Sequence, residues 1–261
     1  MAPNARNNVL LVGGSSGVGL ATAKLALTAL PGTNIVLSSS NKERLEKAVQ
    51  ELKSAAPSEE SIIDFVVGDV SNISTQFNDV EAILKAANSI FNGKIDHIIW
   101  TAGSFPHPPQ GDGPKEPSND DLLSVSTTRL FGPLTLTHLG KKYMTNSRKS
   151  SITTSSGVLV YRPRPGIARG IGLLGGLDSA TRGLAVDLAP IRANFVVLGP
   201  IKTPLLEKFA SSEAAMKHMA EGSLLKAVGE ADEAAEAYLA SMRCSYMTGS
   251  RIDCDGGALL V

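Results

Sequence analysis

The strongest structural signal in this chain is the segment Val12-Gly13-Gly14-Ser15-Ser16-Gly17-Val18-Gly19. An apolar run at residues 9–12 leads into it, and a helix-like run at residues 20–30 follows and stops at Pro31 and Gly32. Glycines between a strand and a helix carry no Cβ atoms, so backbone amides at the helix N-terminus can approach a pyrophosphate. The segment therefore predicts a strand, turn and helix that bind a dinucleotide.

Short apolar strands and helices alternate along the rest of the chain. Strand patterns lie at residues 34–38, 62–67, 95–101, 151–155, 195–198 and 251–254, and helical patterns at residues 42–53, 77–91, 121–143 and 177–188. This alternation predicts a parallel sheet with helices on both faces. We expect one α/β domain over residues 1–261, doubly wound and of Rossmann type, with a mostly parallel seven-stranded sheet. Ligands bind such sheets outside the carboxyl ends of the strands.

Two segments depart from the alternation. Residues 104–118 contain five prolines and two glycines, too many for a helix or strand, and are expected to form a surface loop near the ligand. Residues 205–228 have the pattern of one or two short amphipathic helices in the position of a lid.

Composition narrows the class of partner. The chain has 261 residues, 43% of them hydrophobic, and its formal net charge is zero. Such a balance gives no electrostatic footprint for nucleic acid or for an anionic membrane, which favours a small-molecule substrate. The chain starts without an apolar signal core, and no apolar run is long enough to span a bilayer. A cytoplasmic enzyme is expected.

The two cysteines, Cys244 and Cys254, lack the spacing of a disulfide framework or a zinc site. We expect buried thiols in a reducing compartment and no bound metal.

The end of the second predicted strand indicates which dinucleotide binds. NAD-binding sheets usually carry an acidic residue about twenty positions after the glycines, where it accepts a hydrogen bond from the ribose 2′-hydroxyl. Here the stretch reads Ser38-Ser39-Ser40-Asn41-Lys42. No carboxylate repels a 2′-phosphate there, and hydroxyls, an amide and a lysine can donate to it. This favours NADP(H) over NAD(H), although the serines would also suit an ordinary solvated turn.

The G-x3-G-x-G spacing resembles that of the short-chain dehydrogenase/reductase family, and the resemblance extends over the whole chain. Gly68-Asp69-Val70 is similar to the family's adenine-contacting turn, Trp100-Thr101-Ala102-Gly103 stands where the family has N-N-A-G, and residues 198–203 resemble its nicotinamide-side motif. The resemblance and the strand ends together imply the following cofactor-binding residues: Gly13, Ser15, Ser16, Gly17, Val18, Gly19, Ser39, Ser40, Asn41, Asp69, Val70, Thr101, Ala102, Gly103, Ile201 and Thr203.

The family's usual proton donor is missing. Its members pair a tyrosine with a lysine four residues later, and the phenol protonates the alkoxide that forms as hydride arrives. None of the four tyrosines here is followed by lysine at that spacing. Alignment with the family places Gly170 at the tyrosine position and Leu174 at the lysine position.

Two other catalytic positions of the family hold functional groups. Ser156 stands at the serine position, and Ser155 is an equal candidate within a shift of one residue. Arg129 stands at the asparagine position, where a buried guanidinium would need a partner. Tyr161 is the leading substitute for the missing acid.

One subgroup of the family also lacks the tyrosine and lysine. It comprises the bifunctional reductase/Diels-Alderases of fungal indole alkaloid pathways, which this chain resembles in Arg129 before Phe131-Gly132-Pro133, in residues 182–187 and in residues 256–261. The resemblance implies hydride transfer from NADPH to an iminium-type intermediate, followed by a cycloaddition. The subgroup has an aspartate in a P-D-P-G segment, whereas this chain has Arg164 between Pro163 and Pro165.

The loss of the tyrosine and lysine suits one class of substrate. A cationic C=N⁺ group becomes a neutral amine when hydride adds, so no oxyanion develops and no phenol is required. Several positive side chains argue in the other direction, because they would repel a cation and favour carbonyl-rich or enolate-like substrates. These are Arg129, Arg162, Arg164, Arg169 and Lys202.

Three functions remain open from sequence. The first is an NADPH-dependent reductase of an activated imine, with a coupled cyclisation; the second is a cyclase or isomerase that binds NADP without net redox change; the third is a non-catalytic dinucleotide-binding protein. Arg129, Ser156, Arg164 and Lys202 are the candidate catalytic residues. The family resemblance implies a homodimer or homotetramer formed through the helices at residues 121–143 and 177–188.

Overall fold

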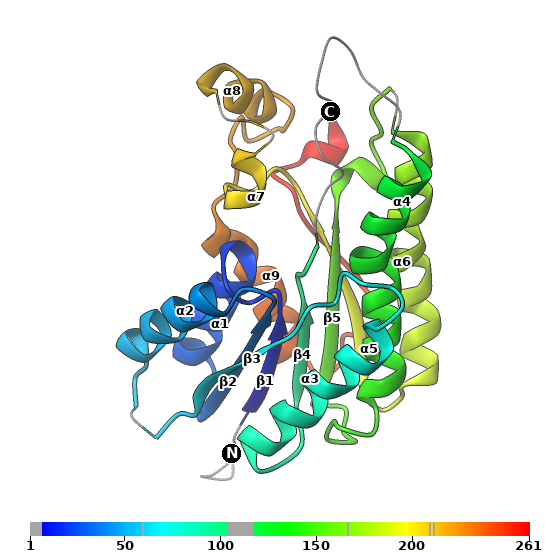
Figure 1. Ribbon diagram of the computed structural model, residues 1–261. Helices are drawn as coiled ribbons and strands as arrows, with labels where there is room; N and C mark the ends of the chain where they lie inside the picture. The colour runs from blue at the N-terminus through cyan, green and yellow to red at the C-terminus, as the bar shows by residue number, and fades with distance from the viewer. Residues whose placement is uncertain (1–6, 59, 104–116, 166, 209, 211) are drawn as a thin grey trace.

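A seven-stranded sheet forms the centre of the computed structural model, which describes residues 7–58, 60–103, 117–165, 167–208, 210 and 212–261 (Figure 1). Its strand order is β3-β2-β1-β4-β5-β6-β7, and every neighbouring pair is parallel. The predicted doubly wound fold is confirmed, with a sheet that is wholly rather than mostly parallel. The strands are β1 (Asn7–Val12), β2 (Thr33–Ser39), β3 (Ile63–Val67), β4 (His97–Trp100), β5 (Ser151–Gly157), β6 (Arg192–Leu198) and β7 (Arg251–Cys254).

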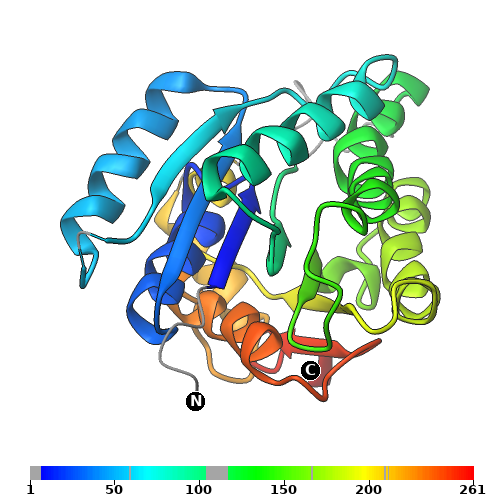
Figure 2. The same cartoon turned by 90° about the horizontal axis from the view of Figure 1, so that it is seen from below.

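Helices cover both faces of the sheet, as Figure 2 shows from below. One face packs against α1 (Gly17–Ala29), α2 (Lys42–Ala55) and α9 (Ala231–Arg243). The other packs against α3 (Gln76–Phe91), α5 (Gly132–Gly140) and α6 (Ala168–Asp187). Burial on both faces explains the apolar runs of β1, β4 and β6, whereas the buried strand β5 consists mainly of serine and threonine.

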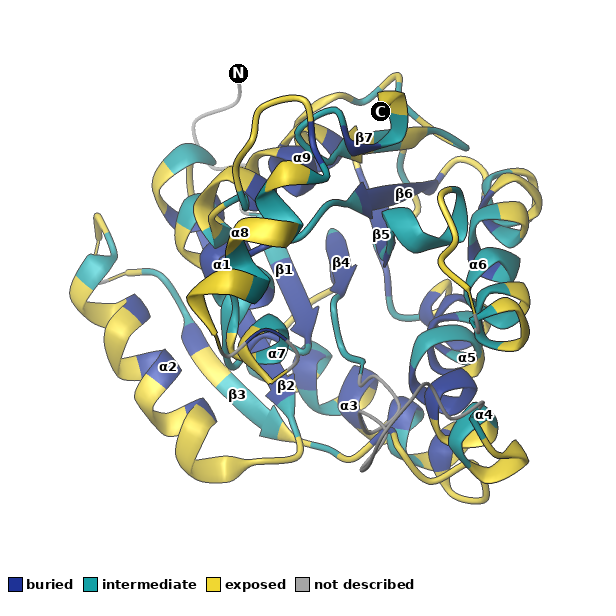
Figure 3. Cartoon of the chain, turned by 90° about the horizontal axis from the view of Figure 1, so that it is seen from above, coloured by how far each residue is buried: buried dark blue, intermediate teal, exposed yellow. Residues whose placement is uncertain are grey.

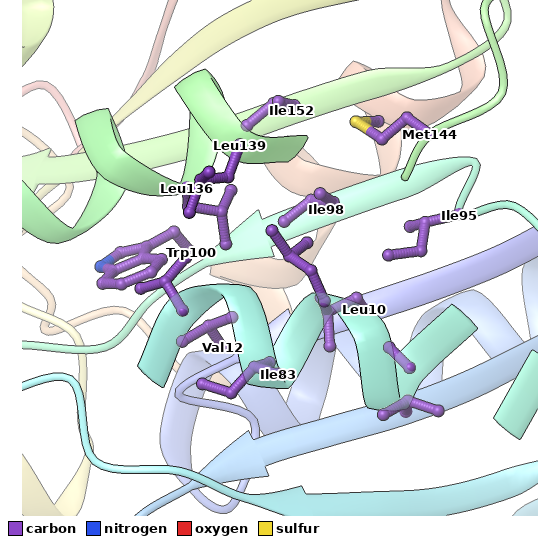
Figure 4. Packing of buried hydrophobic residues seen from close by; sticks show 14 of the residues in the cluster. Leu10, Val12, Ile83, Ile95, Ile98, Trp100, Leu136, Leu139, Met144 and Ile152 are labelled. Carbon is purple, nitrogen blue, oxygen red and sulfur yellow. The ribbon is translucent and has the colours of Figure 1, made fainter. Parts of the chain in front are cut away.

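Apolar side chains from strands and helices interlock between the sheet and α3 and α5. Leu10, Ile98 and Trp100 project from neighbouring strands toward Ile83 of α3 and Leu136 of α5 (Figure 4). All five are buried. This packing fixes the end of β4, where Trp100 is the last residue of the strand.

The long helix predicted at residues 121–143 is present as a continuous helical segment over residues 119–140, but it is not one regular α-helix. The structure has α4 (Asn119–Ser126), a π-helical turn (Thr127–Phe131) and then α5. Two buried side chains donate to carbonyl oxygens of the wide turn: Gln76 Nε2 to Thr127 at 2.6 Å and Trp100 Nε1 to Thr128 at 3.0 Å. Donors from outside a helix disturb its regular hydrogen-bond ladder, and π-turns occur often at functional sites.

Short helices lie over the carboxyl ends of the strands, as predicted for residues 205–228. They are α7 (Pro204–Glu207) and α8 (Glu213–Glu221), seen from above in Figure 3. The predicted loop at residues 104–118 lies outside the described residues except for Pro117 and Ser118. Single-turn helices at Val158–Val160 and Ala258–Leu260 complete the described elements.

The expectation of buried thiols is wrong. Cys244 is exposed because it follows the last residue of α9, and Cys254 is half-buried at the end of the edge strand β7. Neither forms a disulfide. In the part of the chain that the structure describes, no helix could cross a bilayer and no three potential metal ligands gather.

A buried histidine in β4 makes the fold sensitive to acid. His97 Nδ1 lies 2.9 Å from Ser151 Oγ, and burial together with the Arg192 guanidinium lowers the pKa of His97 to about 3. An unfolded chain takes up this proton near pH 6.5, whereas the folded chain does not, so stability is lost as the pH falls from about 6.5 toward 3.

We expect His97 to lower the free energy of unfolding by about 2 kcal/mol between pH 7 and pH 5. Urea unfolding of the wild type and His97→Gln at both pH values measures this, and the variant should lack that part of the change. The same pH dependence in both proteins would contradict the prediction.

Candidate cofactor and substrate site

A cavity of about 430 Å³ opens at the carboxyl ends of the strands. This is the position and size expected for a ligand site in a doubly wound sheet. Of the sixteen cofactor residues expected from sequence, the structure brings all but Asn41 into its wall. They are Gly13, Ser15, Ser16, Gly17, Val18, Gly19, Ser39, Ser40, Asp69, Val70, Thr101, Ala102, Gly103, Ile201 and Thr203.

The glycine-rich segment 13–19, which includes the turn after β1 and the start of α1, packs too closely for side chains at its first and last glycines. Gly13 has φ +94°, and a Cβ there would lie 2.4 Å from the backbone nitrogen of Ala102. A Cβ on Gly19 would lie 2.5 Å from the carbonyl oxygen of Gly13. The α1 N-terminus begins after Ser16, whose side chain makes no capping bond, and its first turn has no acidic residue. Its amides thus suit an anion such as a pyrophosphate.

Asn41 has a structural role instead of lining the cavity. It is the N-cap of α2, and its Oδ1 accepts a hydrogen bond from the backbone nitrogen of Arg44 at 2.8 Å. The first turn of α2 carries Arg44 back to the cavity wall, beside Ser39 and Ser40. The lysine suggested from sequence, Lys42, lies outside the wall and pairs with Glu46 at 3.7 Å.

Charge around this end of the cavity is favourable for an anion. Asp69, after β3, is the only carboxylate among the described residues of the wall, and its Oδ1 accepts from the backbone nitrogen of Ser71 at 2.9 Å. The end of β2 contributes only Ser38, Ser39 and Ser40. The end of β2 therefore brings no carboxylate into the described part of the cavity wall.

Arg129 lies on the π-helical turn and extends to the end of β4. It is half-buried, and a Cβ on Gly103 would lie 2.8 Å from its Cζ, so the glycine leaves room for the guanidinium. Burial lowers the pKa of Arg129 to about 10, which leaves it positively charged at neutral pH. The turn is held by Trp100, so the core packing of β4 also positions Arg129.

Both serine candidates at the end of β5 line the cavity. Ser156 is buried, and its Oγ has no hydrogen-bond partner among the described residues. Ser155 is half-buried in the adjoining position. The alternatives left by the sequence therefore both stay in the site.

The positions of the missing acid lie on α6. Neither Gly170 nor Leu174 is among the described residues of the cavity wall. Tyr161, the suggested substitute, does not line it either; burial and the neighbouring Asp178 raise the pKa of Tyr161 to about 12. A phenol with such a pKa is a poor proton donor at neutral pH.

Most of the positive side chains considered from sequence point elsewhere. The structure does not bring Lys202 into the cavity: its backbone nitrogen bonds to Gly229, and its exposed amine lies 3.9 Å from Glu230. Arg164 is exposed and also outside the wall.

Arg162 and Arg169 hold loops together. Arg162 donates to the carbonyl oxygens of Gly222 and Ala258, and Arg169 to that of Pro117. Of the five cations, only Arg129 lines the described cavity, so these side chains do not crowd it with positive charge.

Tyr238 of α9 is a wall residue that sequence reasoning missed, together with Arg44. Its side chain is fully buried in the cluster between the sheet and α1, α2 and α9. The helix itself was not predicted, and nothing in the sequence shows that this buried tyrosine lies beside the cavity.

Comparison with known proteins agrees with this geometry. A family profile described as enoyl-(acyl carrier protein) reductase matches residues 12–258. The short-chain dehydrogenase/reductase ATR9 of Stachybotrys chlorohalonatus (strain IBT 40285) is 34% identical over 263 residues, which cover 97% of each chain. The short-chain dehydrogenase/reductase malC of Malbranchea aurantiaca is 31% identical over 270 residues and is covered completely, as is this chain. The solved structure of the MalC reductase/Diels-Alderase is similar with a TM-score of 0.88 and 30% identity, covering 98% of this chain and 97% of that one.

Proposed function

The chain belongs to the short-chain dehydrogenase/reductase family, and we propose that it is an NADPH-dependent reductase of an activated imine or iminium group. Its substrate would be an alkaloid-type intermediate of the kind found in fungal specialised metabolism. One observation carries the proposal: the cavity keeps the walls that suit a dinucleotide, but holds Arg129 and no tyrosine–lysine pair among its described residues. Bound NADPH would supply the hydride.

The chemistry of an iminium group explains why no acid is needed. Hydride adds to the carbon of C=N⁺, the π electrons move to nitrogen, and the product is a neutral amine. A ketone instead develops an oxyanion, for which protonation by a positioned acid contributes roughly 10²-fold to 10⁴-fold. The chain's own task is then to hold the acceptor carbon at the reacting distance and to exclude water, and positioning can supply much of the rate enhancement.

Arg129 and the two serines are suited to that positioning. A guanidinium can donate two parallel hydrogen bonds to a carbonyl or carboxylate group, which fixes orientation as well as position. Arg129 lies at the same end of the cavity as Ser155 and Ser156. An amide or carbonyl group elsewhere on the substrate is the partner that we infer for it.

The function is tested by following NADPH absorbance with two probe acceptors. An N-methyl dihydroisoquinolinium salt should be reduced at least about 10²-fold faster than a simple aryl ketone, because only the ketone requires an acid. Comparable turnover of the ketone would contradict the proposal and would direct attention to Tyr161 as the acid.

Arg44 underlies the proposed preference for NADPH. We expect Arg44→Ala to weaken NADPH binding about tenfold and to leave NADH binding nearly unchanged, because a charge-assisted hydrogen bond to the 2′-phosphate is lost. Calorimetric titration with both cofactors measures this. Lys42→Ala is the matched control, because this substitution removes the same charge from the same turn of α2 and Lys42 lies outside the cavity wall. The prediction would be contradicted if Arg44→Ala weakened the binding of NADPH and NADH equally, or if both variants lost the same NADPH affinity.

A coupled Diels-Alder cyclisation is the second candidate activity. It is favoured by the similarity to the structure named MalC reductase/Diels-Alderase, which covers nearly the whole chain. A cyclase that binds NADP without net redox change would form product from a diene precursor while NADPH absorbance stays constant. Product analysis beside the absorbance trace therefore separates such a cyclase from a reductase with a coupled cyclisation.

We also propose that the protein assembles as a homodimer or homotetramer through α4, α5 and α6. In the single chain α6 buries only Leu177 and Thr181 of its twenty residues, and its Val186 is 77% exposed, so much of the helix surface is available to a second copy.

A further inference from the structure

Gln76, the first residue of α3, joins two parts of the cavity wall from behind. It is 2% exposed and lies outside the described wall. Its Nε2 donates to the carbonyl oxygen of Val70 at 2.6 Å and to that of Thr127 at 2.6 Å. Val70 lines the cavity, and Thr127 is the first residue of the π-helical turn that bears Arg129. One buried side chain thus connects the wall segment after β3 to the turn of Arg129.

The two carbonyl oxygens require the amide group of a glutamine. Its NH2 group has two N–H donors, so each donor can meet one oxygen. A carboxylate has no such donor, and an aliphatic side chain would leave both oxygens without this partner. The oxygen of Thr127 also accepts the π-helical hydrogen bond from the backbone nitrogen of Gly132. Gln76 therefore supports the same oxygen that closes the wide turn.

Trp100 supports this turn from the end of β4 (Figure 4). Its Nε1 donates to the carbonyl oxygens of Thr128 and Ala102, both at 3.0 Å, and both of these residues line the cavity. Its ring packs so closely on Gly132 that a Cβ there would lie 2.5 Å from Trp100 Cζ2. The chain is therefore held both before and after Arg129.

We propose that Gln76 is a positioning residue, which fixes the π-helical turn against the wall segment at Val70 and so places the Arg129 guanidinium for a carbonyl group of the substrate. Gln76 would act through Arg129 and touch neither substrate nor cofactor. Functional side chains need such support, because their geometry must stay within a fraction of an ångström of the productive one. This inference rests on the proposed function, in which Arg129 contacts the substrate.

The test compares Gln76→Met, which removes the amide and keeps the length of the side chain, with Asn194→Leu. The second substitution makes the matched change at a buried amide that lies outside the described cavity wall and donates to the carbonyl oxygen of Met247 at 2.9 Å. At saturating NADPH, Gln76→Met should lower kcat about 10-fold for a dihydroisoquinolinium probe that carries a carboxamide arm. Asn194→Leu should change this kcat by less than about twofold.

A double-mutant cycle shows whether the effect passes through Arg129. In the Arg129→Ala background, Gln76→Met should change kcat by less than about twofold, because the group that it positions is gone. A loss of equal size in both backgrounds would overturn the inference, since a general structural defect does not depend on Arg129. If Gln76→Met does not fold, Trp100→Phe removes the other donor to the turn, and the same pattern is expected of it in the same cycle.

The fluorescence of Trp100 gives a second readout that needs no substrate. Trp100 is the only tryptophan of the chain, and its N–H group donates directly to the turn. Gln76→Met should shift the emission maximum to longer wavelengths, because a loosened turn admits water to the buried indole, and Asn194→Leu should not shift it. Unchanged emission together with unchanged kcat in Gln76→Met would overturn the inference.

The same readout separates this inference from the proposed function. A wild type that binds NADPH but reduces no iminium probe would refute the proposed reductase. The emission of Trp100 would still show whether Gln76 holds the turn: a shift in Gln76→Met supports this role, and an unchanged maximum overturns it.

Discussion

Replacing Arg129 with alanine is expected to lower the turnover of a dihydroisoquinolinium probe that carries a carboxamide arm by about 10²-fold, while NADPH affinity changes by less than about twofold. The guanidinium lies against Gly103, after β4, and shares the cavity wall with the serines of β5. In the proposed function it contacts the substrate, and the amides of the β1–α1 turn contact the phosphates. Its loss therefore misplaces the substrate without removing a phosphate contact. Single-turnover rates measured beside cofactor titrations give both quantities.

Two further variants separate orientation from charge. Arg129→Lys keeps the positive charge but lacks the planar fork, so it should recover little of the lost rate. Gly103→Ala keeps the arginine but places a Cβ 2.8 Å from its Cζ, which forces the guanidinium to move and should lower turnover as well. Normal turnover in Arg129→Ala would make Arg129 structural, and Ser156 would then be the next candidate.

The parts of the fold that follow from local pattern could be predicted from sequence. The glycine turn after β1 and the apolar runs of β1, β4 and β6 identified the doubly wound sheet, because strands buried on both faces favour apolar residues. The cofactor wall followed for the same reason, since strand ends and the turns after them are adjacent along the chain. Sixteen residues were expected there, and only Asn41 lies outside the wall, because its side chain caps α2.

The features that were missed depend on contacts between distant segments. The π-helical turn requires donors from Gln76 and Trp100, which lie far from it in the sequence. The side chain of Arg44 reaches the cavity only because α2 starts at the end of β2, and Tyr238 only because α9 packs beside α1. The hydrophobic periodicity of a helix does not show that a particular side chain of that helix lies beside a cavity. Arg164 and Lys202 were placed by motif alone, and the structure leaves both outside the described wall.

Gly13→Ala is expected to lower the free energy of unfolding by about 3 kcal/mol and to weaken NADPH binding. Position 13 has φ +94°, where a side chain is strained, and the new Cβ would lie 2.4 Å from a backbone nitrogen of residue 102. Strain of this kind costs about 1–3 kcal/mol and overpacking about as much again. No flexible side-chain end can yield there, because all three of the nearest atoms belong to the backbone at the end of β4.

Gly172→Ala supplies the matched control, because it makes the same chemical change at a glycine that is exposed in α6. A Cβ at that position would meet no atom within 4 Å, so alanine should stabilise the helix by up to about 1 kcal/mol. Urea unfolding of both variants, with and without NADPH, measures the two effects. If Gly13→Ala were as stable as the wild type and bound NADPH equally well, the turn after β1 would have room that this geometry denies, and its assignment as the pyrophosphate site would be wrong. The opposite signs expected for the two substitutions arise from backbone conformation and free space alone, since the atom added is the same.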